Sequence, residues 1–210
     1  MIEIIHIAPE PNRAGRHLVT FSDGSVRKLL PSVIGDLGLY TGLSLDEEGM
    51  EALNAAESAA NAKQRAIHII SATTVSGREL TRRLKQKGAT PEDAENTVRW
   101  LEELALLDDA KAAQQVVSQG VRRGYGARRI RQMLYEKNIP REYWEDALAQ
   151  IPPMDGAIDT FIESRLHGQT GEKEVKRTVD ALVRRGYTWS EIKEGLRRYE
   201  IAMADEIEED

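Results

Sequence analysis

Residues 122–135 read RRGYGARRIRQMLY, a glycine-rich opening followed by a helical pattern. At about 3.6 residues per turn, Ile130 shares one side of this helix with Ala127, Met133 and Leu134, so this side can enter a core. The opposite side carries Arg128, Arg131, Gln132 and Tyr135. Guanidinium groups beside an aromatic ring can bind phosphate, stack on a base or pair with carboxylates. A solvated charged face without a partner is the alternative.

The same helical pattern occurs three times in the sequence. Gly88, Asn138 and Gly186 align as turn residues, and glycine and asparagine accept the left-handed conformation that ends a helix. The aligned columns hold Leu84, Leu134 and Leu182 before the turn, and Val98, Leu148 and Leu196 after it. Each turn leads into a helix start, namely Thr90-Pro91, Pro140-Arg141-Glu142 and the capping box Thr188–Glu191. A third apolar segment precedes each pair, which predicts three-helix units.

We therefore predict a mainly α-helical protein with three tandem three-helix units, over residues 63–107, 108–151 and 152–201, in an elongated array. Units of about 45 residues bury little surface alone, so neighbouring units should lean on each other. Asp108 is the expected cap of the second unit. An acidic tail follows over residues 202–210.

Residues 1–62 predict a small β-hairpin-plus-helix N-terminal module. The isoleucines of residues 2–7 indicate a short strand, and Asp23-Gly24 is a two-residue hairpin signal. A capping-box pattern, Ser44 with Glu47, is expected to open a helix. That helix becomes alanine-rich near residue 60, where we expect a helical linker to the first three-helix unit.

Charge is distributed unevenly along the chain, whose net charge is −6. Residues 76–141 hold 14 Lys and Arg against 9 Asp and Glu, whereas residues 1–62 hold 4 against 9 and residues 142–210 hold 9 against 17. This polarity suits a target that presents both nucleic acid and protein. The outward basic stripes consist of Arg78, Arg82 and Lys85 in the first unit, and of Arg128, Arg131 and Tyr135 in the second.

No motif for catalysis or cofactor binding stands out. The chain has no cysteine, its four histidines are far apart in the sequence, and no phosphate-binding loop occurs. We therefore expect a protein that is not an enzyme and uses no metal or cofactor. No apolar run approaches about 18 residues, and the start of the chain lacks a signal-peptide pattern, so we expect a cytoplasmic protein without membrane contact.

Three stretches, in this order, resemble the RecX family, the bacterial regulators of the RecA recombinase. The first unit carries Ser76-Gly77-Arg78-Glu79-Leu80, the second carries residues 126–131 with Leu134, and the third carries Arg184-Arg185-Gly186-Tyr187. The resemblance covers residues 66–200. Asn138 departs from it, because the family usually has glycine there. Val116-Val117 departs too, because phenylalanine is common at that place.

The resemblance implies a non-enzymatic regulator that binds along the groove of the RecA–single-stranded DNA filament. It would modulate, in the inhibitory direction, the ATPase, strand-exchange and coprotease activities of RecA. Expected partners are the RecA filament, the single-stranded DNA within it and, more weakly, double-stranded DNA, and the protein itself would be a monomer. The expected contact residues are Arg78, Arg82, Lys85, Arg122, Arg123, Tyr125, Arg128, Arg129, Arg131, Tyr135, Lys137 and Lys176.

Two other functional classes stay open from the residues alone. One is a DNA-binding protein of tandem homeodomain-like three-helix units that acts without RecA. The other is a protein scaffold that touches no nucleic acid. A comparison of binding to naked DNA with binding to a RecA–DNA filament distinguishes all three classes.

Overall fold

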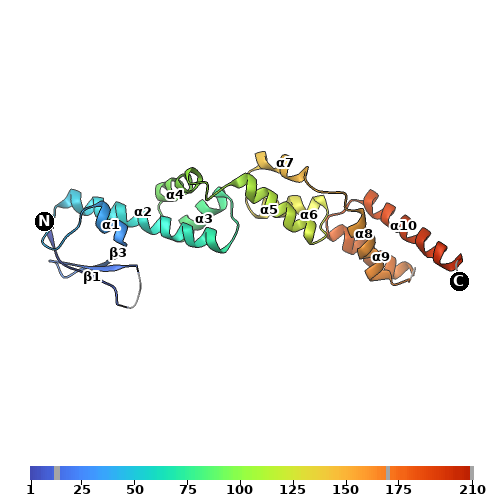
Figure 1. Ribbon diagram of the computed structural model, residues 1–210, viewed down its shortest axis with the longest axis horizontal. Helices are drawn as coiled ribbons and strands as arrows, with labels where there is room; N and C mark the ends of the chain where they lie inside the picture. The colour runs from blue at the N-terminus through green and yellow to red at the C-terminus, as the bar shows by residue number, and fades with distance from the viewer. Residues whose placement is uncertain (12–14, 169–170, 209–210) are drawn as a thin grey trace. The chain divides into compact units, whose positions relative to one another are not determined.

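The computed structural model of the chain is mainly α-helical, as predicted (Figure 1). It describes residues 1–11, 15–168 and 171–208, with side chains as far as residue 200. These ranges contain ten α-helices, one short 3-10 helix and four strands. The chain divides into two compact bodies. The first comprises Met1–Thr73 and Leu80–Leu107, and the second comprises Thr74–Glu79 and Asp108–Asp210.

The first body begins with a four-stranded antiparallel sheet. Its strands are β1 (Ile2–Pro9), β2 (His17–Phe21), β3 (Val26–Leu29) and β4 (Ser44–Leu45), in the order β3-β2-β1-β4. The predicted hairpin between β2 and β3 is confirmed, but its loop is longer than two residues. Phe21 N–H donates to Ser25 O, and Gly24 takes a left-handed φ of 83° within the loop of residues 22–25.

Two helices accompany the sheet, α1 between β3 and β4 and α2 after β4. Helix α1 (Pro31–Asp36) is short, and α2 (Glu47–Ala72) runs for 26 residues without interruption. The expected cap at Ser44 was wrong, because Ser44 lies in β4, and Asp46 caps α2 by accepting from Gly49 N–H. Leu53 of α2 packs with Ile4, Phe21 and other apolar side chains of the sheet. The boundary expected at residue 62 falls inside α2, which therefore serves both the sheet and the first three-helix module.

The first three-helix module consists of the second half of α2, α3 (Gly77–Gln86) and α4 (Pro91–Glu103). Thr90 caps α4 by accepting from Asp93 N–H, and Pro91 takes the first helical position, as predicted. The inner sides of α3 and α4 are buried at Leu84, Val98 and Leu101. The first residues of α3, as far as Glu79, belong to the second body.

The second body contains the other two modules. The second module consists of α5 (Asp109–Arg122), α6 (Ala127–Glu136), the 3-10 helix η1 (Arg141–Tyr143) and α7 (Trp144–Leu148). The third consists of α8 (Asp155–Leu166), α9 (Glu172–Arg184) and α10 (Trp189–Glu208). Buried clusters around Ile130 and Leu134, and around Ile162 and Leu182, form their separate cores.

The threefold repeat of turn residues is confirmed. Gly88, Asn138 and Gly186 have left-handed φ angles of 86°, 52° and 90°. The capping box is confirmed too, since Thr188 N–H donates to the Glu191 carboxylate and Glu191 N–H donates to the Thr188 hydroxyl. The expected acidic tail lies outside the residues whose side chains are described, although α10 extends to Glu208. Within the described parts of the chain, no helix is long and apolar enough to cross a membrane.

Candidate functional site

The stretch 122–135 forms the end of α5, a tight turn and helix α6. Helix α6 begins without a side-chain cap at Gly126. Its free backbone donors are satisfied by the third module instead. Gly126 N–H donates to Arg185 O at 2.9 Å, and Arg128 N–H donates to Gly186 O at 3.3 Å. The start of α6 is therefore fixed by the turn between α9 and α10.

Two glycines make this backbone contact possible. A Cβ atom at Gly126 would lie 2.5 Å from Gly186 O, and a Cβ atom at Gly186 would lie 2.2 Å from Arg129 N. Neither approach is tolerated by a residue with a side chain. Gly186 also has a left-handed φ of 90°, which glycine adopts without steric cost. Gly126 is therefore required for packing, and Gly186 is required for packing and for the turn.

Arg185 and Tyr187 complete the joint between the second and third modules. The Arg185 guanidinium donates to Arg123 O at 2.9 Å and lies 4.5 Å from the centre of the Phe161 ring. The Tyr187 hydroxyl donates to Gly124 O at 3.0 Å, and burial raises the pKa of this phenol. The Arg185-Gly186-Tyr187 motif thus acts within the chain, where it positions α6.

The segment Thr74–Glu79 contacts the second module in an equivalent way. Ser76, which aligns with Gly126, donates its hydroxyl to Lys137 O at 3.1 Å and to Asn138 O at 2.9 Å. The Asn138 amide donates to the buried Glu79 carboxylate at 2.8 Å. In both places, the residues at the start of a middle helix hold the turn that follows the next middle helix. This contact repeats with the sequence pattern.

Most of the expected contact residues lie at the surface. The exposed ones are Arg78, Arg82, Lys85, Arg122, Arg123, Arg128, Arg131, Tyr135 and Lys176, and the half-buried ones are Tyr125, Arg129 and Lys137. The structure brings Arg122, Arg123 and the α6 residues together within the second module. Arg82 and Lys85 belong to the first body, and Lys176 lies on α9.

Several of these residues already have partners within the chain. Tyr125 packs against the core of the second module, and Arg129 forms an ion pair with Glu136 at 3.0 Å. Lys85 pairs with Glu95 at 2.9 Å. By contrast, the described residues give the side chains of Arg128 and Arg131 no hydrogen bond or ion pair. Tyr135 is 64% exposed, so it lies free beside them on α6.

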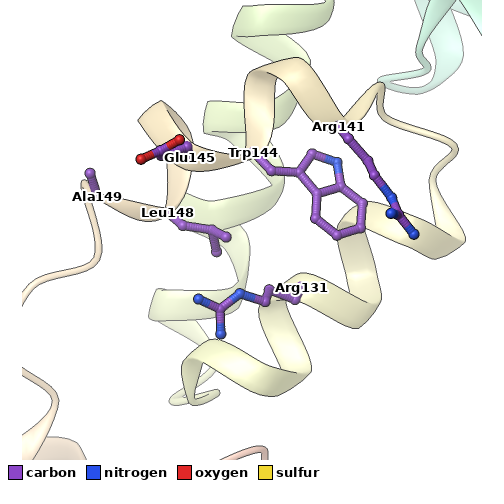
Figure 2. A pocket seen from close by; sticks show the side chains of 6 residues that line it. All are labelled: Arg131, Arg141, Trp144, Glu145, Leu148 and Ala149. Carbon is purple, nitrogen blue, oxygen red and sulfur yellow. The ribbon is translucent and has the colours of Figure 1, made fainter.

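The sequence did not reveal a groove between α6 and α7, of about 660 Å³ (Figure 2). Its walls are formed by Arg131, Arg141, Trp144, Glu145, Leu148 and Ala149. The Trp144 indole N–H donates to Ile139 O at 3.0 Å, and the Arg141 guanidinium lies 5.9 Å from the indole ring. The sequence pattern had placed Leu148 in an aligned apolar column and Arg141 at a helix start, so neither was expected to line a groove.

The described residues offer no metal centre, since no group of three or more His, Asp or Glu side chains is placed to bind an ion. The outer face of α6 instead presents the guanidinium groups of Arg128 and Arg131 and the exposed ring of Tyr135. Such a surface can bind phosphates, bases or carboxylates.

Comparisons with known proteins match this architecture. A family model for RecX, second three-helix domain, matches residues 108–148, which lie within the second module. The regulatory protein RecX of Shigella boydii is 30% identical over 148 residues, which cover 64% of this chain and 89% of that protein. The chain belongs to the RecX family. The regulatory protein RecX of Cronobacter sakazakii is 38% identical over 95 residues, or 40% of this chain and 58% of that relative.

Solved RecX structures share the fold. A crystal structure of a regulatory protein RecX superimposes with a TM-score of 0.67 and 24% identity, covering 92% of this chain and all of that one. RecX from Lactobacillus salivarius gives a TM-score of 0.62 and 16% identity over 70% of this chain and 99% of its own. At these identities the likeness concerns the fold. The relatives are named regulatory proteins, which agrees with a surface that binds another macromolecule.

Proposed function

We propose that this protein binds the RecA–single-stranded DNA filament and lowers its ATPase, strand-exchange and coprotease activities, without catalysing a reaction itself. The observation that carries the proposal is the unpaired face of α6, in the module that the family model matches. Arg128, Arg131 and Tyr135 are exposed there together.

The chemistry of this face fits a nucleoprotein target. Free guanidinium groups bind phosphate oxygens in a bidentate way, and an exposed tyrosine ring can stack on an unpaired base. The fixed start of α6 supports the same function, because the contacts of Gly126 and Arg128 with the third module hold the helix in place before a partner arrives. Such preorganisation lowers the entropy cost of binding.

A second candidate, DNA binding without RecA, uses the same face of α6. The net charge of −6 disfavours it, because non-specific DNA binding depends on neutralising many phosphates. A filament that presents protein and DNA together would supply contacts that naked DNA lacks.

The test is a titration of the protein into a RecA ATPase assay on single-stranded DNA, with filament binding measured in parallel by co-sedimentation. We expect saturable binding to the filament, a decreasing rate of ATP hydrolysis, and much weaker binding to naked DNA. An unchanged rate together with no binding to the filament would contradict the proposal. Equal binding to naked DNA and to the filament would favour the second candidate.

A further inference from the structure

We propose that the groove between α6 and α7 is a protein-binding site, which takes an acidic segment with a large apolar side chain from the protein component of the filament. This inference rests on the filament binding proposed above. It assigns Arg131 and Arg141 to the protein partner and leaves Arg128 and Tyr135 for DNA.

The apolar wall of the groove is preformed. Trp144 and Leu148 are half-buried and pack against the core of the second module. Because the Trp144 indole N–H already donates to Ile139 O, the ring presents apolar surface with its polar atom satisfied. Tryptophan and arginine are enriched among the residues that dominate protein–protein binding. A wall of this kind suits a large apolar side chain.

The aliphatic part of the wall disfavours a nucleobase. Leu148 and Ala149 line the groove beside Trp144, and Figure 2 shows Arg131 facing this wall from α6. Base recognition on single strands depends on successive aromatic faces. Here the one aromatic ring is flanked by methyl groups and is already approached by the Arg141 guanidinium at 5.9 Å.

The charges point to a carboxylate rather than a phosphate backbone. Arg131 and Arg141 lie on different elements of the groove, and each can donate two hydrogen bonds to one carboxylate. Glu145 also lines the groove, so its net formal charge is only +1. A strand of phosphates would be repelled by Glu145, whereas a peptide can place one carboxylate near the arginines and another group near Glu145. The volume of about 660 Å³ lies within the range of specific binding pockets, about 300–1,000 Å³.

The groove residues belong to the second module and do not follow from the repeat. At the positions of Arg131, Arg141 and Trp144, the first module has Thr81, Pro91 and Ala94, and the third has Val179, Trp189 and Ile192. At these three aligned positions, neither of the other modules has an arginine. The combination is therefore a local feature added to a shared fold.

The decisive variants are Ala149→Trp, which fills the groove without changing charge, and Arg141→Glu, which reverses one of its cations. Both residues are exposed, so the fold should be kept, as circular dichroism and melting can verify. The matched controls are Gln150→Trp beside the groove and Arg99→Glu on the first body. We expect each groove variant to weaken filament binding at least tenfold, and to change affinity for naked single-stranded DNA less than twofold.

The outcomes separate this inference from the proposed function. If the wild-type protein does not bind the filament, the proposed function fails, and the groove proposal, which depends on it, fails as well. If the wild type binds but Ala149→Trp and Arg141→Glu bind equally well, only the groove proposal fails. An equal loss of affinity for naked DNA would show a nucleic-acid site and would also overturn it. If Ala149→Trp does not fold, Arg141→Glu still decides the question.

A cross-linking experiment identifies the occupant directly. Because the chain has no cysteine, Gln150→Cys, beside the groove, creates a unique attachment site for a benzophenone reporter that leaves the groove open. Irradiation on a filament with labelled DNA should join this chain to protein, and adding Arg131→Glu and Arg141→Glu should remove the product. Cross-links to DNA would overturn the proposal. The absence of cross-links in a labelled protein that still binds the filament would overturn it as well.

Discussion

Gly126 and Gly186 bring two backbones together at a distance that no side chain permits. The Gly126 and Arg128 N–H groups donate to the Arg185 and Gly186 carbonyls, which replace a capping side chain at the start of α6. At Gly186, one residue meets two demands, a left-handed turn and close packing, and each demand excludes a Cβ atom. The relative placement of the second and third modules therefore depends on the lack of a Cβ atom at Gly126 and at Gly186.

Gly186→Ala should be strongly destabilising for this reason. A left-handed alanine costs about 1–2 kcal/mol, and overpacking typically costs about 1–3 kcal/mol more, so we expect a loss of about 2–5 kcal/mol. Gly124→Ala is the matched control, because Gly124 also has a positive φ, of 65°, but its nearest neighbour would be at an ordinary 3.5 Å. Urea unfolding followed by tryptophan fluorescence measures both. Equal losses would show that conformation alone, and not packing, requires glycine at residue 186.

Asn138 combines the turn with a side-chain contact. Its φ of 52° would suit glycine better, but its amide donates to the buried Glu79 carboxylate. We expect Asn138→Gly to lose about 1–2 kcal/mol, because a hydrogen bond to a charged group is removed while the backbone relaxes. Asn138→Ala should lose about 1 kcal/mol more, since alanine also resists the left-handed conformation. Thermal or urea unfolding of the three proteins should give this order, and a more stable Asn138→Gly would contradict it.

The turn residues could be recognised in the sequence because their conformation is local. Glycine and asparagine reveal a left-handed φ wherever they align. Their packing partners could not be recognised, since Gly186 meets Arg129 and Asn138 meets Glu79 across long sequence separations. In the sequence, the Arg185-Gly186-Tyr187 motif was interpreted only as a family signature. Its hydrogen bonds to the Arg123 and Gly124 carbonyls became evident only in the folded chain.

At the scale of elements, helix α5 starts with two aspartates whose pKa values shift in opposite directions. Asp108 caps the helix, and the hydrogen bond from Lys111 N–H lowers its pKa. Asp109 is half-buried, and burial raises its pKa although Gly77 N–H donates to its carboxylate. The two carboxylates therefore have different roles, since Asp108 caps the start of α5 and Asp109 accepts a hydrogen bond from the segment Thr74–Glu79.

Asp109→Asn tests the cost of that buried charge. A carboxyl group whose folded-state pKa lies above its ordinary 3.8 stabilises the fold when protonated, and this contribution is lost as the pH rises through the raised value. Asparagine keeps an acceptor for Gly77 N–H without the charge. We expect Asp109→Asn to be at least as stable as the wild type at pH 7, with a smaller advantage at pH 4.

Asp109→Ala is the matched comparison for this variant, because alanine removes the acceptor as well as the charge. Leaving Gly77 N–H without this partner should cost about 1–3 kcal/mol at both pH values. Urea unfolding at pH 4 and pH 7 measures all three proteins. If Asp109→Asn loses as much stability as Asp109→Ala at pH 7, then the charge itself, and not only the acceptor, holds the segment.

Helix starts were predictable where the cap is a local motif, as at Thr90, Asp108 and Thr188. The cap expected at Ser44 failed because tertiary pairing intervened. Leu45 pairs with Ile2 in the sheet, so the chain stays extended for two residues and Asp46 takes over the cap. The groove beside Trp144 was not predicted either, because it too depends on tertiary structure. Helix α7 is short and follows a 3-10 turn, which leaves the indole half-buried instead of enclosed.

For the whole molecule, the number of repeats was evident in the sequence, but their grouping was not. Helix α2 is long enough to join the β-sheet core at Leu53 and to supply buried residues such as Ala66 to the first three-helix module. An apolar pattern shows that a helix has a buried side, but it does not say how many cores that side enters. The two compact bodies follow from contacts that only the folded chain defines.

The uneven charge of the molecule leads to a prediction about salt. If Arg128 contacts a phosphate, Arg128→Glu should weaken filament binding and reduce the slope of log affinity against log salt by about 0.7, the value for one lost single-strand contact. If Arg141 contacts a carboxylate, as proposed for the groove, Arg141→Glu should weaken binding with a smaller and less regular change in slope. Arg99→Glu makes the same change in net charge on the first body, and so controls for long-range electrostatics.

Filament affinities of the three variants, measured by fluorescence anisotropy between 50 and 300 mM salt, separate these contributions. Parallel changes in slope for Arg128→Glu and Arg99→Glu would mean that only net charge matters. Wild-type affinity in a folded Arg128→Glu protein would mean that α6 presents a solvated charged face without a partner. A reduced slope for Arg128→Glu, together with a nearly constant slope for Arg141→Glu, would instead indicate that Arg128 on α6 contacts the DNA of the filament. The groove with Arg141 would then contact its protein. A chain with net charge −6 can bind a nucleoprotein in that way, because its cations need to meet only a few phosphates while protein contacts supply the rest.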